Sequence, residues 1–198
     1  MPRVEYTPPD ELPDEYDVLA EERDNLHEDI TAEWWNSQGT VRSFGNNPAL
    51  AKVHVFANVK MWTESGLTPQ EVEYVILAVS REIESKYEWQ DHVIAAYQQL
   101  ERFDAPGLSR DEILMISDKD TESMDDSIQA LVEYSFELVD TYGAVSDECH
   151  DALSEHYDDS TIVGIAMLAS YYIFIHHVAT ALDLDIDEEF VGWNLENI

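Results

Sequence analysis

The residues best placed for chemistry are Glu88 and His92, a carboxylate and an imidazole four positions apart in a segment whose pattern favours helix. Because an α-helix turns by about 100° per residue, these side chains share one face and can touch. A nearby carboxylate raises the pKa of an imidazole while burial lowers it, so the balance can hold His92 near neutrality, where acid–base catalysis works best. The pair predicts a proton-transfer site. On an exposed helix it would be only a solvated pair worth about a few tenths of a kcal/mol.

The elements that must position this pair are helical. Pro48 suits the first turn of one helix, and Thr68–Glu71 has capping-box spacing with proline at the first helical position of the next. The second helix has apolar residues at the positions i, i+3, i+4 and i+7 of one face, namely Val72, Val75, Ile76 and Val79. The helical pattern then continues past Ser80 to the Pro106–Gly107 interruption.

Further helices are predicted on both sides of this region. Residues 17–35 favour helix, Ser109 begins a second capping box, residues 125–142 form an amphipathic segment, and Ser146 begins another helix. A long apolar helix begins at Ser160 or Thr161 and ends at the acidic run 183–189. Prolines at positions 2, 8, 9 and 13 predict an extended tail over residues 1–16. The pattern predicts one all-α domain over residues 17–198.

The charge of the chain excludes several kinds of partner. Its 43 acidic and 10 basic residues give a formal net charge of −33, which repels nucleic acid and anionic membranes. Intrinsic disorder does not explain this acidity, because 44% of the residues are hydrophobic, enough to build a core. Molar salt screens such self-repulsion, so the composition is typical of cytoplasmic proteins of extreme halophiles.

Cysteine and membrane signals are weak. Cys149 is the only cysteine, so no intrachain disulfide or cysteine-rich metal site can form. Residues 161–182 are long enough to span a bilayer, but aspartates flank them and they include His176 and His177, which favours a central or interface helix. Those two side chains point about 100° apart, and such adjacent histidines rarely bind the same metal ion.

The N-terminus does not have the pattern of a signal peptide. We therefore expect a cytoplasmic protein without metal or cofactor.

The order of four short motifs resembles the carboxymuconolactone decarboxylase family, which includes the alkylhydroperoxidase D-like proteins. The resemblance covers about residues 45–182 and rests on the segments Asn47–Leu50, Leu67–Glu73, Tyr87–His92 and Gly107–Ile113. It implies an alkylhydroperoxidase D-like helical bundle that assembles as a homo-oligomer and acts on a small-molecule substrate.

The resemblance also implies a set of site residues. In the peroxidase branch a glutamate, a Cys-x-x-Cys pair and a histidine fall on Glu73, Ser85, Glu88 and His92, so both sulfur positions are lost here. A hydroxyl and a carboxylate cannot cycle between dithiol and disulfide, which disfavours peroxide reduction by that route. The family's usual arginine before the first glutamate is replaced by Val72.

What remains matches the cysteine-free members, which implies a decarboxylase-like enzyme for a small organic acid or lactone. His92 would deliver a proton and be oriented by Glu88 or Glu73, while Arg81, Ser85 and Trp89 are the candidate substrate contacts. One straight helix would hold Glu73 and His92 about 28 Å apart, so the resemblance predicts a break between residues 81 and 87, or a site shared between subunits.

Two alternatives stay open at this stage. One is a peroxidase that uses Cys149 with an external thiol. The other is a non-catalytic scaffold or ligand-binding protein, which predicts a site around His92 that is collapsed or open to bulk water.

Overall fold

The computed structural model describes residues 2–12, 39–100, 105–186 and 189–198, and these ranges contain helices and no strand. The predicted all-α class is confirmed. The helix expected at 17–35 lies outside the described residues. The helices are α3 (Gly39–Phe44), α4 (Pro48–Glu64), α5 (Pro69–Glu82), α6 (Lys86–Ile94), α7 (Arg110–Asp118), α8 (Asp126–Asp140), α9 (Asp147–Ser154) and α10 (Asp159–Leu182), with a π-helical turn at Ala95–Gln99 after α6.

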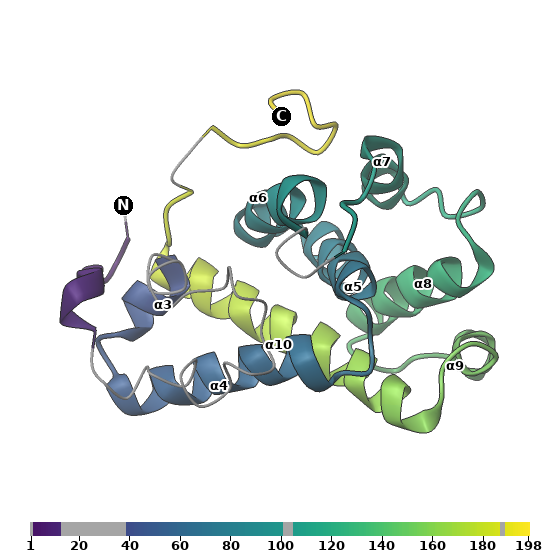
Figure 1. The fold of residues 1–198 in the computed structure, drawn as a ribbon, viewed down its shortest axis with the longest axis horizontal. Helices are drawn as coiled ribbons and strands as arrows, with labels where there is room; N and C mark the ends of the chain where they lie inside the picture. Colours follow the sequence, from purple (N-terminus) through teal and green to yellow (C-terminus); the bar gives the residue numbers. More distant parts are fainter. Residues whose placement is uncertain (1, 13–38, 101–104, 187–188) are drawn as a thin grey trace.

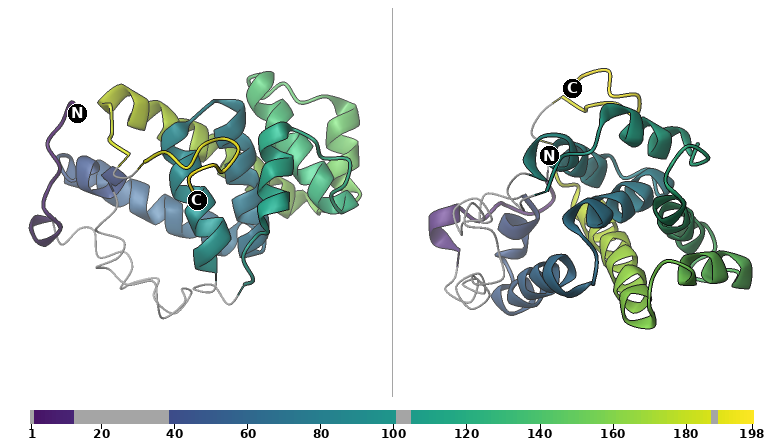
Figure 2. Two further views of the ribbon diagram at one scale, coloured as in Figure 1. Left: turned by 90° about the horizontal axis from the view of Figure 1, so that it is seen from above. Right: turned by 45° about the vertical axis from the view of Figure 1, so that its right-hand side comes forward.

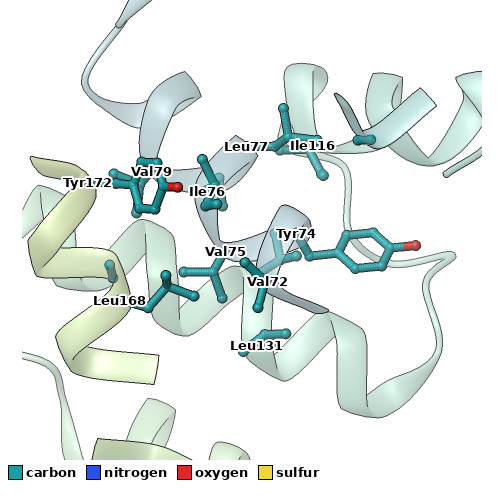
Figure 3. Close-up of a cluster of buried hydrophobic side chains, with 14 of the residues drawn as sticks. Val72, Tyr74, Val75, Ile76, Leu77, Val79, Ile116, Leu131, Leu168 and Tyr172 are labelled. Carbon is teal, nitrogen blue, oxygen red and sulfur yellow. The ribbon is translucent and has the colours of Figure 1, made fainter. Parts of the chain in front are cut away.

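Helix α5 is the centre of the bundle, with α6, α7, α8 and α10 packed around it (Figure 1). Its N-terminus has the predicted capping box: Thr68 Oγ1 accepts from the Glu71 amide, and the Glu71 carboxylate accepts from the Thr68 amide at 2.8 Å. Residues 72–80 are all buried. The predicted apolar face is confirmed, and Figure 3 shows Val72, Val75, Ile76 and Val79 among core side chains that include Leu131, Leu168 and Tyr172.

Helices α4 and α10 lie side by side along one flank of the bundle (Figure 1). Asn47 caps α4, and Asp158 caps α10 by accepting from the Thr161 amide at 2.8 Å. The expected start at Ser160 or Thr161 was therefore slightly late, because the aspartate before them supplies the cap. By length and composition α10 could cross a bilayer, yet one side of it is buried against α5 and α8.

The two ends of the chain are attached to the bundle. Residues 2–12 are irregular except for a 3-10 turn at Pro9–Glu11, and they are held where the Arg3 amide donates to the Leu182 carbonyl at 2.7 Å. The C-terminal segment, residues 189–198, crosses α6 toward α7, as the two views of Figure 2 show. It covers the side of α6 that faces away from the Glu88–His92 pair.

Candidate functional site

The site depends on a sharp turn between α5 and α6. The amide of Ser85 donates to the Ser80 carbonyl at 2.8 Å, and the amide of Glu84 donates to the Arg81 carbonyl, which together make a Schellman motif. The motif needs a left-handed residue, and Glu84 supplies it with φ = 54°. Ser85 then caps α6 by accepting from the Glu88 amide at 3.4 Å. The break predicted between residues 81 and 87 is confirmed, and α6 folds back along α5.

This turn brings His92 between two buried carboxyl groups. His92 Nδ1 lies 2.9 Å from Glu73 Oε2, and His92 Nε2 lies 3.7 Å from Glu88 Oε2. The side chains of Glu73 and Glu88 are almost completely buried, and that of His92 is 13% exposed. A carboxylate at hydrogen-bond distance from Nδ1 favours the tautomer with the proton on Nδ1, which leaves Nε2 facing Glu88. All three residues belong to one chain, so no second subunit is needed to bring Glu73 to His92.

Burial and mutual charge set the proton affinities of this triad. Burial raises the pKa of Glu88 to about 8, against the opposing influence of His92. Burial alone would lower the pKa of His92, but Glu73 and Glu88 beside it outweigh that effect and raise it. Burial also raises the pKa of Glu73, and the imidazole limits the rise. At neutral pH the triad therefore contains a protonated Glu88 carboxyl next to an imidazole whose pKa is raised by its two carboxyl neighbours.

Aromatic side chains from α4 and α10 enclose the imidazole. The ring of Trp62 stacks on His92, with centroids 6.4 Å apart and an interplanar angle of 18°. Tyr172 presents an edge to the same imidazole at 5.0 Å, and its hydroxyl accepts from Trp62 Nε1 at 3.3 Å. Tyr171 extends this wall, because its ring contacts Tyr172 and its hydroxyl lies 2.6 Å from Nδ1 of the buried His54. The imidazole is therefore flanked by aromatic rings and by two buried carboxyl groups.

The predicted substrate contacts have different surroundings. The Arg81 side chain points to α7 and the C-terminal segment: its Nε donates to the Ser117 carbonyl at 2.8 Å, and its guanidinium lies 5.0 Å from the Trp193 ring centroid. Trp89 is fully buried and donates to the Gly192 carbonyl at 3.2 Å. Ser85 is buried as the helix cap. The structure thus unites Glu73, Glu88 and His92, and it engages Arg81 and Trp89 elsewhere.

Sequence reasoning missed the aromatic residues of the enclosure. Trp62 and Tyr172 are 110 positions apart, and neither has a spacing relation to the Glu88–His92 pair. Both were visible only as apolar residues of their helices, because contacts between distant helices leave no periodic signal. In the part of the chain that the structure describes, no group of three or more His, Cys, Asp or Glu side chains is arranged to hold a metal ion.

Comparison with known proteins identifies the fold. No family model and no curated relative match the sequence. Among solved structures, an uncharacterized peroxidase-related protein from Ralstonia eutropha JMP134 with an alkylhydroperoxidase AhpD core is similar, with a TM-score of 0.70 and 15% identity over 98% of this chain and 96% of that one. An AhpD-like protein of unknown function from Agrobacterium tumefaciens has a TM-score of 0.64 and 18% identity, over 74% and 96% of the two chains.

The debrominase Bmp8 in its apo form is a further neighbour, with a TM-score of 0.66 and 14% identity over 79% of this chain and 81% of that one. At these identities the similarity concerns the fold. The chain has the AhpD-like helical fold predicted from its motifs.

Proposed function

From the AhpD-like fold and its buried Glu73–His92–Glu88 triad, we propose that this protein is an enzyme that moves a proton on a small carbonyl compound such as a lactone. The observation that carries the proposal is the position of His92, an imidazole enclosed by aromatic rings and held between two buried carboxyl groups. Pairs of titratable groups with such perturbed pKa values are characteristic of acid–base sites.

Each group of the triad has a role in this proposal. Nε2 of His92 removes a proton from the carbon next to the carbonyl, and the Glu73 carboxylate stabilises the imidazolium that forms. Glu88 donates its proton to the carbonyl oxygen, so the electron pair of the broken C–H bond ends in a neutral enol. Return of a proton from His92 to carbon, at the same or a conjugated position, and of the enol proton to Glu88 restores the enzyme.

Decarboxylation, the finer activity that the resemblance implied, receives less support. Loss of carbon dioxide from an organic acid requires a group that holds the substrate carboxylate, and Arg81 was the candidate cation. Its guanidinium is engaged by Ser117 and Trp193. We therefore favour a lactone or a related carbonyl compound over an organic acid.

A solvent-exchange experiment tests this proposal without knowledge of the natural substrate. A panel of small lactones in deuterium oxide is incubated with the enzyme, and deuterium incorporation next to the carbonyl is followed by NMR. We expect incorporation into at least one compound at a rate that His92→Gln lowers by about 10²-fold or more. The exposed His150, changed to Gln, is the control. Equal rates for the wild type and His92→Gln would refute the proposal.

Two other functions find less support in the geometry. A peroxidase that uses Cys149 requires a thiolate, but burial and the nearby Glu137 raise the pKa of this thiol to about 12. Cys149 also lies on α9, which packs mainly against α8 and α10. A scaffold was expected to have a site that is collapsed or open to bulk water, and the 13% exposure of the His92 side chain argues against the open case.

We also propose that the protein assembles as a homo-oligomer through the outer face of α4 and α10, in a cytoplasm of high salt. Large apolar side chains are exposed there, including Leu50, Val53, Phe56, Val163, Met167 and Phe174. These two helices contain only two of the 43 acidic residues, Glu64 and Asp159, so copies can approach on this face without strong repulsion. Light scattering in molar salt should give a mass above 22.7 kDa, and Met167→Glu should reduce it to the monomer.

A further inference from the structure

Two buried oxygens in the site lack a hydrogen-bond donor. In each glutamate one carboxyl oxygen faces His92, and the other, Oε1 of Glu73 or of Glu88, is buried without a partner among the described residues. Buried oxygens of native proteins are nearly always paired, because an unpaired acceptor retains the full cost of its desolvation. A ligand with a hydrogen-bond donor would therefore pair with one of these two oxygens.

A third buried acceptor without a partner among the described residues lies on α4. Oδ1 of Asn58, on α4, is buried without a partner, while the Asn58 side chain is hydrogen-bonded to the Tyr171 hydroxyl. Burial chiefly, and the negative charge of Glu88 in part, raise the pKa of Tyr171.

In the part of the chain that the structure describes, the site has no lysine or arginine to pair with negative charge. Among the described residues no lysine or arginine is in contact with Glu73, Glu88 or His92. Arg81 is held by Ser117 and Trp193, and Lys60 on α4 pairs with Glu64. A carboxylate ligand would meet two buried carboxyl groups with only the His92 imidazole to offset the added negative charge, which is unfavourable.

We propose that the Glu73–His92–Glu88 site takes a small, uncharged ring compound that presents an O–H or N–H donor, and that it rejects anions. This inference rests on the proposed function and narrows its substrate class from lactones in general to ring compounds with a hydroxyl or N–H group. The donor pairs with the open Oε1 of Glu88, and the ring packs against the aromatic side chains that flank His92. A site built to pair such a donor discriminates strongly against an analogue that lacks it.

Three probes with the same ring test this proposal by binding alone: phenol, which has a donor; anisole, whose methyl ether has none; and benzoate, which is an anion. Binding is read from the imidazole nitrogen resonances of ¹⁵N-histidine-labelled protein, with His92 assigned through His92→Gln. Molar potassium chloride shortens the screening length to about 3 Å, so that discrimination reflects the site and not the net charge of the chain. We expect phenol to bind at least about tenfold more tightly than anisole, and benzoate not to shift His92.

Variants at Glu88 locate the acceptor. Glu88→Gln keeps a carbonyl oxygen and should retain the preference for phenol over anisole, whereas Glu88→Met has no acceptor and should reduce it to about twofold or less. Glu122→Gln, at an exposed glutamate outside the turn between α5 and α6, is the matched control. Equal binding of phenol and anisole to the wild type, or benzoate binding as tight as phenol, would overturn the proposal, as would a preference unchanged in Glu88→Met. Selective phenol binding without deuterium exchange would leave this inference standing and refute the proposed catalysis.

Discussion

The two sides of α6 differ in how completely their polar groups are paired. On the side that faces the C-terminal segment, the Gln90 amide accepts from the Val191 amide at 2.7 Å and donates to the Glu189 carbonyl at 3.4 Å, and Trp89 donates to Gly192. On the opposite side, Glu88 has one buried oxygen without a donor and the other 3.7 Å from His92. The same nine-residue helix is therefore anchored by one face and carries the reactive groups on the other.

This difference shows how the fold can tolerate a costly site. A buried, incompletely paired carboxyl group destabilises the folded state, and such a group persists only where its surroundings hold it in place. The C-terminal segment supplies that support by pairing with Trp89 and Gln90 of α6. The segment is itself held by Arg110 of α7, which donates to the carbonyls of Asn194 and Leu195. Substitutions on the face with Glu88 and His92 should therefore lower activity. Substitutions on the face that meets the C-terminal segment should lower stability.

The largest effect is expected on the reactive face. Glu73→Gln removes the charge that stabilises the imidazolium of His92 and favours a different tautomer, so we expect the exchange rate to fall by about 10²- to 10⁴-fold. The measurement is deuterium incorporation by the purified variant, with circular dichroism to verify the fold. Glu84→Gln serves as the control and should retain the wild-type rate. A loss of less than tenfold in Glu73→Gln would contradict the assigned role.

The anchoring face should respond in stability. Gln90→Leu keeps the side-chain volume but leaves the buried Val191 amide unpaired, so we expect it to lower the free energy of unfolding by about 1–3 kcal/mol. Denaturant titration in molar salt measures this change, and Gln98→Leu, at an exposed glutamine, should have little effect. The exchange rate per folded molecule should remain within about threefold of the wild type. A variant that is stable but inactive would mean that the back of α6 participates in the chemistry.

An effect spread over several pH units follows from the raised pKa of Glu88. This group ionises near pH 4.5 in the unfolded chain and at about 8 in the folded one, so the folded state binds more protons between these values. Stability contributed by the neutral carboxyl is therefore lost as the pH rises through this window, by at most about 1.4 kcal/mol per unit. Glu88→Gln does not titrate, so unfolding free energies from pH 5 to 9 should fall less steeply for this variant. Parallel curves for the two proteins would show that Glu88 has an ordinary pKa.

The smallest effect concerns the turn that joins α5 to the reactive helix. Glu84 adopts φ = 54°, which costs a residue with a Cβ about 1 kcal/mol and costs glycine almost nothing. Glu84→Gly should therefore raise the free energy of unfolding by about 0.5–1 kcal/mol, measured by denaturant titration, without changing the exchange rate. Glu122→Gly, at an exposed glutamate outside this turn, is the control. Destabilisation by Glu84→Gly would indicate that the glutamate side chain itself supports the turn.

The sequence predicted the parts of this architecture that depend on local chemistry. Thr68 and Ser109 begin capping boxes where expected, and the apolar face of α5 is buried, because caps and periodicity are properties of neighbouring residues. The break at Glu84 had no such signal, since a left-handed glutamate replaces the usual glycine. It was predicted only from the order of motifs shared with a family.

The same limit applies to the site. Glu88 and His92 follow from helical spacing, but Glu73 joins them only through the turn, and Trp62 and Tyr172 only through the packing of α4 and α10. The direction of Arg81 was equally hidden, because its partners Ser117 and Trp193 are 36 and 112 positions further along the chain. Which face of a buried helix meets which neighbour is decided by tertiary packing, which local patterns do not encode.

The protonation of His92 tests the central claim most directly. In ¹⁵N-histidine-labelled protein, a titration followed by two-dimensional nitrogen–proton spectra reports both the tautomer and the pKa of this imidazole. We predict a proton on Nδ1, hydrogen-bonded to Glu73, with a pKa above the 6.5 of a free imidazole because two buried carboxyl groups flank the ring. A neutral ring with its proton on Nε2, or a pKa at or below 6.5, would contradict this account.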